Sequence, residues 1–302
     1  MIPSAFRYES AFARNIGWVT RDEQAALRGK RVAIAGLGGV GGSHLLTLAR
    51  LGVGAFNISD KDTFEVVNLN RQAGAVVSTL GESKTKVLQW MAHDINPDLH
   101  IKTFDRGIDT GNVRQFLTGC DLYVDGLDFF AVDARREVFA RCAEMGIPAV
   151  TAAPMGMSAA LMVFLPGGMT FEQYFKLQGH SRNEQLLRLL VGLAPALIHR
   201  HYLADPSAVD LVNRRVPSTP MACDLCAGMA ATEALKILLG RGKVLAAPRA
   251  VQFDAYRQKL VRTWRPGGNA NPLNRLTIAF ARKQLGKRRS DSPAAAPVPG
   301  TA

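Results

Sequence analysis

A run of glycines near the start of the chain is the first feature that could perform chemistry. It follows the β-rich stretch Arg31 to Ala35 and consists of Gly36, Gly38, Gly39, Gly41 and Gly42. Glycine lets the backbone turn tightly and lets a phosphate approach the amides, and the N-terminus of a following helix adds donors and a positive dipole. The run predicts a nucleotide-binding turn, with a purely structural tight turn as the alternative.

A carboxylate at the end of the next β-rich run fits such a site. Asp60 follows Gly54 to Ser59, and a carboxylate at this place commonly binds the ribose hydroxyls of a nucleotide. The alternative for Asp60 is a cap of a helix or turn. NAD fits the glycines and Asp60 as well as ATP does, so these residues alone leave the nucleotide open.

Three later residues favour ATP. Arg71 lies in the loop after Asp60, Lys84 begins the next helix, and Asp128 follows the strand Asp121 to Asp125. Cations at the carboxyl edge of an α/β sheet neutralise phosphate charge, and a carboxylate there holds a hard metal ion through oxygen. Taken singly, each is explained by a surface charge or a helix cap. Together they predict a triphosphate with Mg²⁺ and are not needed for a dinucleotide.

Alternating strands and helices must position these side chains. We expect a Rossmann-like, doubly wound α/β fold with a mostly parallel sheet. Thr20 to Glu23 is typical of a capping box at the start of a short helix. The further predicted helices are Val40 to Leu51, Lys84 to Ile95 and Phe130 to Met145, and the further predicted strands are Leu99 to Phe104 and Ile147 to Thr151.

The second half of the chain is expected to add to one large domain, residues 1–265. Ala159 to Phe164 reads as a strand, 171–210 as a helix-rich insertion, and Ala227 to Leu239 as a helix that ends at Gly240. A hairpin is expected at 250–263. Residues 266–302 are predicted to be a basic, Pro/Ala-rich and largely disordered tail, within which Leu273 to Leu285 has the pattern of a basic amphipathic helix.

Composition narrows the partners and the compartment. The formal net charge is +12, which is compatible with nucleic acid, although a solvated basic surface explains it equally well. Four scattered cysteines indicate a reducing compartment. No apolar run has the length of a signal peptide or a membrane span, so we expect a cytoplasmic protein with no membrane contact.

The ordered set of motifs resembles the E1-like activating enzymes of the ThiF/MoeB/HesA family. The resemblance runs from about Arg7 to Arg262. Its motifs are Gly-Leu-Gly-Gly-Val-Gly at 36–41, Asp60-x-Asp62, Asn68-Leu-Asn-Arg-Gln72, Gly81-x-x-Lys84, Ile95-Asn-Pro97, Asp125-x-x-Asp128 and Glu233-Ala-Leu-Lys236.

This resemblance implies an ATP- and Mg²⁺-dependent adenylyltransferase. A carboxylate oxygen would attack the α-phosphate of ATP, giving an acyl adenylate and pyrophosphate. In the family pattern Asp60 is the ribose ligand, Asp128 the Mg²⁺ ligand, and Asn68, Arg71 and Lys84 are phosphate contacts. Asp62 belongs to the same cofactor-binding set. Arg14 resembles an arginine that reaches ATP from the neighbouring subunit of a homodimer.

The chain departs from the family pattern in three places. Many relatives bind structural Zn²⁺ with two CxxC pairs, whereas this chain has only Cys223 and Cys226, so we expect no zinc. No cysteine lies between Pro154 and Ala222, which puts a covalent step on the crossover loop in doubt. Asp128 is followed by Phe129 instead of the usual Asn.

The identity of the activated carboxylate stays open. The leading hypothesis is the C-terminus of a ubiquitin-like or sulfur-carrier protein. A second is a tRNA-directed enzyme of the threonylcarbamoyladenosine dehydratase type, which the basic composition favours. A third is a non-catalytic NAD- or nucleotide-binding module, which would have no use for Arg71, Lys84 and Asp128 together.

Overall fold

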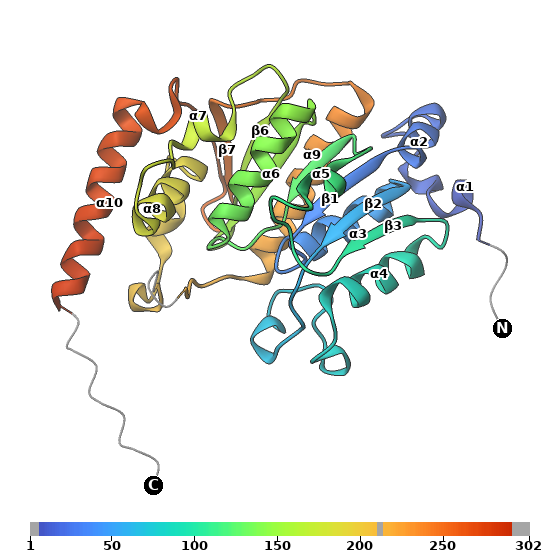
Figure 1. Ribbon diagram of the computed structural model, residues 1–302, viewed down its shortest axis with the longest axis horizontal. Helices are drawn as coiled ribbons and strands as arrows, with labels where there is room; N and C mark the ends of the chain where they lie inside the picture. The colour runs from blue at the N-terminus through green and yellow to red at the C-terminus, as the bar shows by residue number, and fades with distance from the viewer. Residues whose placement is uncertain (1–5, 210–213, 292–302) are drawn as a thin grey trace, which may run out of the picture.

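An eight-stranded sheet runs through the molecule (Figure 1). A computed structural model of the protein describes residues 6–209 and 214–291. The sheet order is β3-β2-β1-β4-β5-β6-β7-β8, in which the first five strands are mutually parallel and the last three are antiparallel. The strands are β1 Arg31–Ala35, β2 Ala55–Ser59, β3 His100–Phe104, β4 Leu122–Asp125, β5 Ala149–Met155, β6 Ser158–Phe164, β7 Arg249–Asp254 and β8 Lys259–Trp264.

The central strands are apolar on both faces, as strands covered by helices on both sides must be. Ile34 of β1 pairs with Ile58 of β2 and with Val124 of β4, and all three side chains are fully buried. The register brings Ala35, Ser59 and Asp125 to the same edge. The loops that leave this edge therefore carry the candidate site.

Helices cover both faces of the sheet, each over its own apolar core. On one face lie α3 Gly41–Leu51, α4 Lys84–Ile95 and α9 Pro220–Leu239, together with α2 Arg21–Arg28. On the other face lie α5 Val113–Leu117, α6 Val132–Met145, α7 Phe171–Phe175 and α8 Arg182–Leu193. The predicted Rossmann-like, mostly parallel α/β fold is confirmed.

Local sequence signals explain where several helices begin and end. The predicted capping box is present, with the Thr20 hydroxyl accepting from the Glu23 amide and the Glu23 carboxylate accepting from the Thr20 amide. α3 ends at Gly52, which adopts φ 94°, a conformation that suits glycine. α1 Tyr8–Ala11 packs nearby, and the Tyr8 hydroxyl donates to the Gly52 carbonyl at 2.6 Å.

Two C-terminal elements differ from the predictions. α9 begins at Pro220 instead of Ala227, because proline is well suited to the first helical turn and extends the helix through both cysteines. The basic helix expected at 273–285 is present as α10 Pro272–Asp291, but it is longer than expected and packs on α8 through Ile278 and the ion pair between Arg282 and Glu184, in a region expected to be largely disordered. The Pro/Ala-rich end, 292–302, lies outside the described residues. No helix among the described residues is long and apolar enough to cross a membrane.

Candidate active site

A cavity of about 1490 Å³ opens along the carboxyl edge of the parallel strands. Its first part is lined by the glycine-rich turn, the loop after β2, the start of α4 and the loop after β4. Its second part extends beneath residues 214–219 towards α8 and α10. The lining of the cavity brings together most of the predicted site residues: Gly36, Gly38, Gly39, Asp60, Asp62, Asn68, Arg71, Lys84 and Asp128.

The glycines of the turn have two different roles. Gly36 has φ 81°, and a Cβ atom there would lie 2.3 Å from the Gly126 carbonyl oxygen. A Cβ atom on Gly41 would lie 1.7 Å from the Gly36 carbonyl oxygen, so this glycine closes the turn without lining the cavity. Gly38 and Gly39 have more space and line the cavity directly. The backbone amides of the turn are thus held at the cavity wall, where an anion can approach them.

Asp60 holds the glycine-rich turn in place. Its Oδ2 accepts a hydrogen bond from the Leu37 amide at 2.7 Å, and its Oδ1 accepts from the Asp62 amide at 2.9 Å. The carboxylate therefore orders the turn even before any nucleotide binds. Its predicted role as the ribose ligand stays a prediction.

The two basic residues that are predicted to contact phosphate differ in how deeply they are buried. Lys84 is buried, and its Nζ lies 3.5 Å from Oδ2 of the more exposed Asp62. Arg71 is fixed by hydrogen bonds to the Val67 carbonyl at 2.9 Å and the Asn70 side chain at 2.8 Å. Asn68 is buried, and its Oδ1 accepts from the Glu65 amide, which shapes the 3-10 helix before Arg71.

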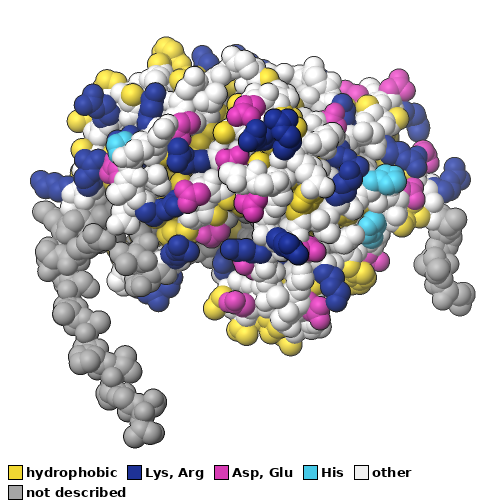
Figure 2. Space-filling model, viewed as in Figure 1, with side chains coloured by type: hydrophobic (Ala, Val, Ile, Leu, Met, Phe, Trp, Pro, Cys, Tyr) yellow, Lys and Arg dark blue, Asp and Glu magenta, His cyan; other side chains and the backbone are white. Residues whose placement is uncertain are grey.

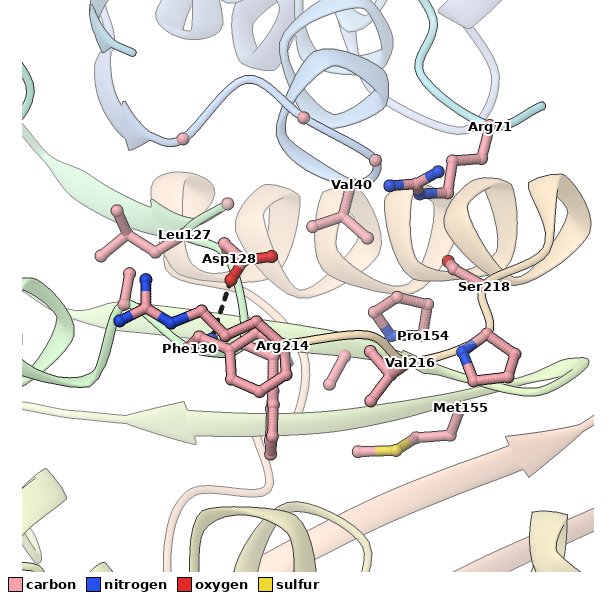
Figure 3. A pocket seen from close by; sticks show the side chains of 18 of the residues that line it. Val40, Arg71, Leu127, Asp128, Phe130, Pro154, Met155, Arg214, Val216 and Ser218 are labelled. Atoms are coloured by element: carbon pink, nitrogen blue, oxygen red, sulfur yellow. Dashed lines mark hydrogen bonds between the residues drawn. The ribbon is translucent and has the colours of Figure 1, made fainter. Parts of the chain in front are cut away.

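Asp128 projects into the middle of the cavity (Figure 3). Its Oδ1 accepts from the Phe130 amide at 2.9 Å, drawn as the dashed line in Figure 3. The glycine-rich turn lies on one side of the carboxylate, and Phe130 and Arg214 lie on the other. The Phe129–Phe130 pair that replaces the usual family residue thus supplies a backbone donor to Asp128.

A buried arginine that the sequence analysis missed supports Asp128. Arg135 of α6 donates to the Asp125 carboxylate at 2.8 Å, to the Asp128 carbonyl at 3.1 Å and to the Leu127 carbonyl. Asp125 also accepts from the Thr151 hydroxyl at 2.9 Å. Arg135 thereby fixes the backbone that carries Asp128, but two adjacent arginines on a helix gave no signal as to which one is buried.

Two further polar residues near the turn were not predicted. Gln72 lines the cavity and is buried, and its Oε1 has no hydrogen-bond partner within the described part of the chain. His44 of α3 is also buried, and neither ring nitrogen has a partner there. Burial lowers the pKa of His44 to about 4, an effect that the nearby Asp125 opposes.

Arg14 does not join the site within one protomer. It is exposed, lies in the 3-10 helix Ala13–Asn15, and does not line the cavity. This position is compatible with a role across a subunit boundary, and the predicted contribution from a neighbouring subunit stays a prediction.

The cysteines lie near the turn without forming a metal cluster. Cys223 and Cys226 are buried in the first turns of α9, and a Cβ atom on Gly39 would lie 3.1 Å from the Cys223 Sγ. Burial raises the pKa of the Cys223 thiol. Within the described ranges no three His, Cys, Asp or Glu side chains are grouped so that they hold a metal ion.

Comparisons with known proteins find matches over much of the chain. The ThiF family model matches residues 12–276. The chain is 30% identical over 148 residues to the sulfur carrier protein ThiS adenylyltransferase of Escherichia coli, covering 49% of this chain and 58% of the relative. It is 32% identical over 145 residues to the tRNA threonylcarbamoyladenosine dehydratase of Haemophilus influenzae, covering 48% and 55% respectively. The matches thus span little more than half of each relative.

Solved structures share the fold across a larger part of the chain. The complex of Escherichia coli MccB with MccA-N7isoASN aligns with a TM-score of 0.65 at 19% identity, covering 87% of this chain and 72% of that one. PaaA aligns with a TM-score of 0.64 at 17% identity, covering 87% and 77%. The family model covers most of the chain and the E1-like fold agrees with it, so the protein belongs to the ThiF family.

Proposed function

We propose that this protein is an ATP- and Mg²⁺-dependent adenylyltransferase that activates the C-terminal carboxylate of a ubiquitin-like or sulfur-carrier protein. The observation that carries the proposal is the single cavity that unites the glycine-rich turn, Arg71, Lys84 and Asp128 with an adjoining chamber. The turn and the cations suit a triphosphate, and the chamber gives a second reactant access to it. A dinucleotide-binding module would not need this set of charges.

The chemistry requires alignment and charge neutralisation. A carboxylate is ionised at neutral pH, so its oxygen attacks the α-phosphate without a general base. Two anions must meet in this step, and Arg71 and Lys84 would lower the repulsion between them by neutralising phosphate charge. The bond from the α-phosphorus to the bridging oxygen breaks, and pyrophosphate leaves.

Asp128 suits a Mg²⁺ ligand. Only one of its oxygens is used by the Phe130 amide, and the carboxylate faces the cavity. Mg²⁺ in nucleotide sites is usually held by one or two carboxylates together with phosphate oxygens. The absence of a protein-only metal cluster among the described residues is therefore compatible with this role. When bound, Mg²⁺ would supply further neutralisation of the phosphates.

We further propose a cytoplasmic homodimer in which Arg14 reaches the neighbouring subunit's nucleotide. Mixing an Arg14→Ala chain with an Arg71→Ala chain tests this arrangement. If Arg14 acts across the boundary, mixed dimers contain one site with both defects and one intact site, and part of the activity returns. Mixing restores nothing if Arg14 acts within its own chain or has no role.

The test of the proposed reaction is ATP–pyrophosphate exchange with candidate small proteins. We expect exchange that depends on the partner and is strongly reduced in Arg71→Ala. No exchange with any partner under conditions in which ATP binds contradicts the proposal.

A tRNA substrate is the second candidate, because several relatives are named tRNA threonylcarbamoyladenosine dehydratase and the net charge is +12. Figure 2 shows basic and acidic side chains interspersed on one face, not a uniformly basic surface. Tight tRNA binding that weakens steeply with salt would favour this candidate.

A further inference from the structure

The second part of the cavity has a lining unlike that of the first. We call it the distal chamber and define it by Met155, Leu190, Leu203, Val209, Val216 and Phe280. Pockets for one small ligand measure roughly 300–1,000 Å³, whereas the whole cavity measures about 1490 Å³. The distal chamber is therefore additional space, continuous through Asp128 and Phe130 with the first part, which we call the nucleotide part because we propose that ATP binds there (Figure 3).

Specific contacts hold the wall of the distal chamber in place. The Tyr202 hydroxyl accepts from the Met157 amide at 3.0 Å, and the Thr219 hydroxyl donates to the Gly156 carbonyl at 2.6 Å. The Asn70 side chain donates to the Ser218 carbonyl at 3.1 Å. Residues 218–219 are thus tied both to the floor of the chamber and to the loop that carries Arg71, so that the two parts of the cavity form one channel.

Unpaired positive charge opens onto the distal chamber. Arg200, Arg214 and Arg215 line it, and none of the three pairs with a carboxylate in the part of the chain that the structure describes. Arg200 instead lies over the Phe280 ring, 5.6 Å from its centre. The lining carboxylate Asp205 accepts from Ser207. Apolar walls beside arginines that have no carboxylate partner among the described residues favour an occupant that combines apolar side chains with negative charge.

His199, a buried histidine in the wall of the distal chamber, adds no positive charge near pH 7. His199 contacts the Gln252 side chain, with 3.3 Å between His199 Nδ1 and Gln252 Nε2. Burial lowers the pKa of His199 to about 4, although Asp254 opposes the shift. The ring is neutral near pH 7, and the positive charge of the chamber comes from its arginines.

We propose that the distal chamber binds an acidic polypeptide C-terminus that carries bulky apolar side chains next to its reacting carboxylate. A Gly-Gly ending would leave the apolar walls without a partner, because glycine has no side chain to bury. A nucleic acid would satisfy the arginines but not these walls. The inference rests on the proposed adenylation of a C-terminal carboxylate, and it narrows the acceptor to a protein whose tail does not end in Gly-Gly.

The experiment compares short N-acetylated peptides with free C-termini in ATP–pyrophosphate exchange. One peptide has two Glu upstream of Leu-Phe-Ala, a second replaces its last residues with Gly-Gly, and a third replaces the Glu residues with Lys. We expect KM for the first peptide to be at least about tenfold below that for the Gly-Gly peptide, as for a buried apolar group. Replacing Glu with Lys should raise KM about fivefold.

Two substitutions test whether the distal chamber causes the preference among the peptides. Ala204→Trp adds bulk at an exposed position of the lining and should shrink the ratio between the first two peptides. Leu276→Trp is the matched control, since Leu276 is exposed on α10 and does not line the cavity. Arg200→Glu should reverse the preference between the Glu and Lys peptides. Unchanged melting temperatures show that both tryptophan variants fold.

The outcomes separate this inference from the proposed function. Exchange that is equal for both endings, or better with Gly-Gly, overturns the inference and leaves adenylation of a C-terminus intact. A preference that survives Ala204→Trp and Arg200→Glu also overturns it, because the selection then lies elsewhere. Absence of exchange with every peptide and protein tail, while ATP and Mg²⁺ bind, overturns the proposed function and the inference together. Binding of tRNA with competition by the acidic peptide identifies the arginines as phosphate contacts instead.

Discussion

The nucleotide part of the cavity and the distal chamber are built in different ways. The nucleotide part is lined by strand ends, a glycine-rich turn and the buried Lys84, and the buried Arg135 holds the backbone of Asp128. The distal chamber is assembled from α8, α10 and the segment 214–219, and its arginines are exposed. ATP presents the same phosphates in every reaction. Its site can therefore be built from residues that follow the strands closely in sequence and are held rigidly. An acceptor varies, and its site is carried by segments that can differ without disturbing the sheet.

The largest expected effect of a substitution is on the support beneath Asp128. Arg135→Ala leaves the buried Asp125 without its ion-pair partner, and losing one partner of a buried pair costs about 3–5 kcal/mol of unfolding free energy. Arg136→Ala is the neighbouring control, since Arg136 pairs with Glu172 in a half-exposed position and should cost about 1 kcal/mol or less. Urea denaturation measures both. Equal losses would show that the Arg135 network does not support the nucleotide part as described.

The next effect is on catalysis in the nucleotide part. Lys84→Ala should raise the barrier by about 3 kcal/mol, which lowers kcat/KM roughly a hundredfold, because it removes a buried cation that we propose neutralises phosphate charge. Lys86→Ala is the matched control on the same helix, since Lys86 is exposed and pairs with Glu82. Exchange kinetics check the pair. Similar rates for the two variants would show that Lys84 has no special role in the reaction.

A buried neutral histidine in each region allows a matched pH experiment. The pKa of His44 and that of His199 are each lowered to about 4 by burial, whereas an unfolded histidine titrates near 6.5. Between these values the unfolded state binds the proton and the folded state does not. Stability therefore falls as pH drops from 6.5 to 4, by up to about 1.4 kcal/mol per pH unit for each histidine.

Substitution separates the contributions of the two histidines to the pH dependence of stability. His44→Leu and His199→Leu should each flatten part of the slope of unfolding free energy against pH. Denaturation at several pH values provides the measurement. A slope that neither buried substitution alters would contradict the neutral state of both rings.

The smallest effect is expected in the distal chamber. Phe280→Ala removes part of the apolar wall and should weaken acceptor binding by about 1 kcal/mol, or about fivefold in KM, since Phe280 is already about half exposed (47%). KM for ATP should not change. Leu276→Ala on the outer side of α10 serves as the control. A rise in KM for ATP alone would show that Phe280 contributes to ATP binding and not to acceptor binding.

The same contrast explains what the sequence could predict. The glycine-rich turn, Asp60, Arg71, Lys84 and Asp128 are recognisable because their roles depend on short spacings after strands. The order of strands and helices around the central sheet is recognisable for the same reason, since β1 follows from a local apolar run and α3 ends at a glycine. ThiF family membership could therefore be anticipated from the motifs.

The distal chamber could not be predicted, because its residues are far apart in sequence and ordinary in type. Phe280 and Leu190 line the same cavity only because α10 packs on α8, and the region from 266 has the composition of a disordered tail. The burial of Arg135 beside the half-exposed Arg136 depends on how α6 is rotated against the sheet. Both features come from tertiary packing and leave no local signal.

The most direct test of adenylation at a C-terminal carboxylate is pyrophosphate exchange with one acceptor in two forms. The acceptor is supplied once with a free C-terminus and once as the C-terminal amide, which has the same side chains but no attacking oxygen anion. We predict exchange with the free acid, none with the amide, and loss of the signal in Asp128→Ala. Equal exchange with both forms, or none with the free acid while ATP binds, would contradict the account.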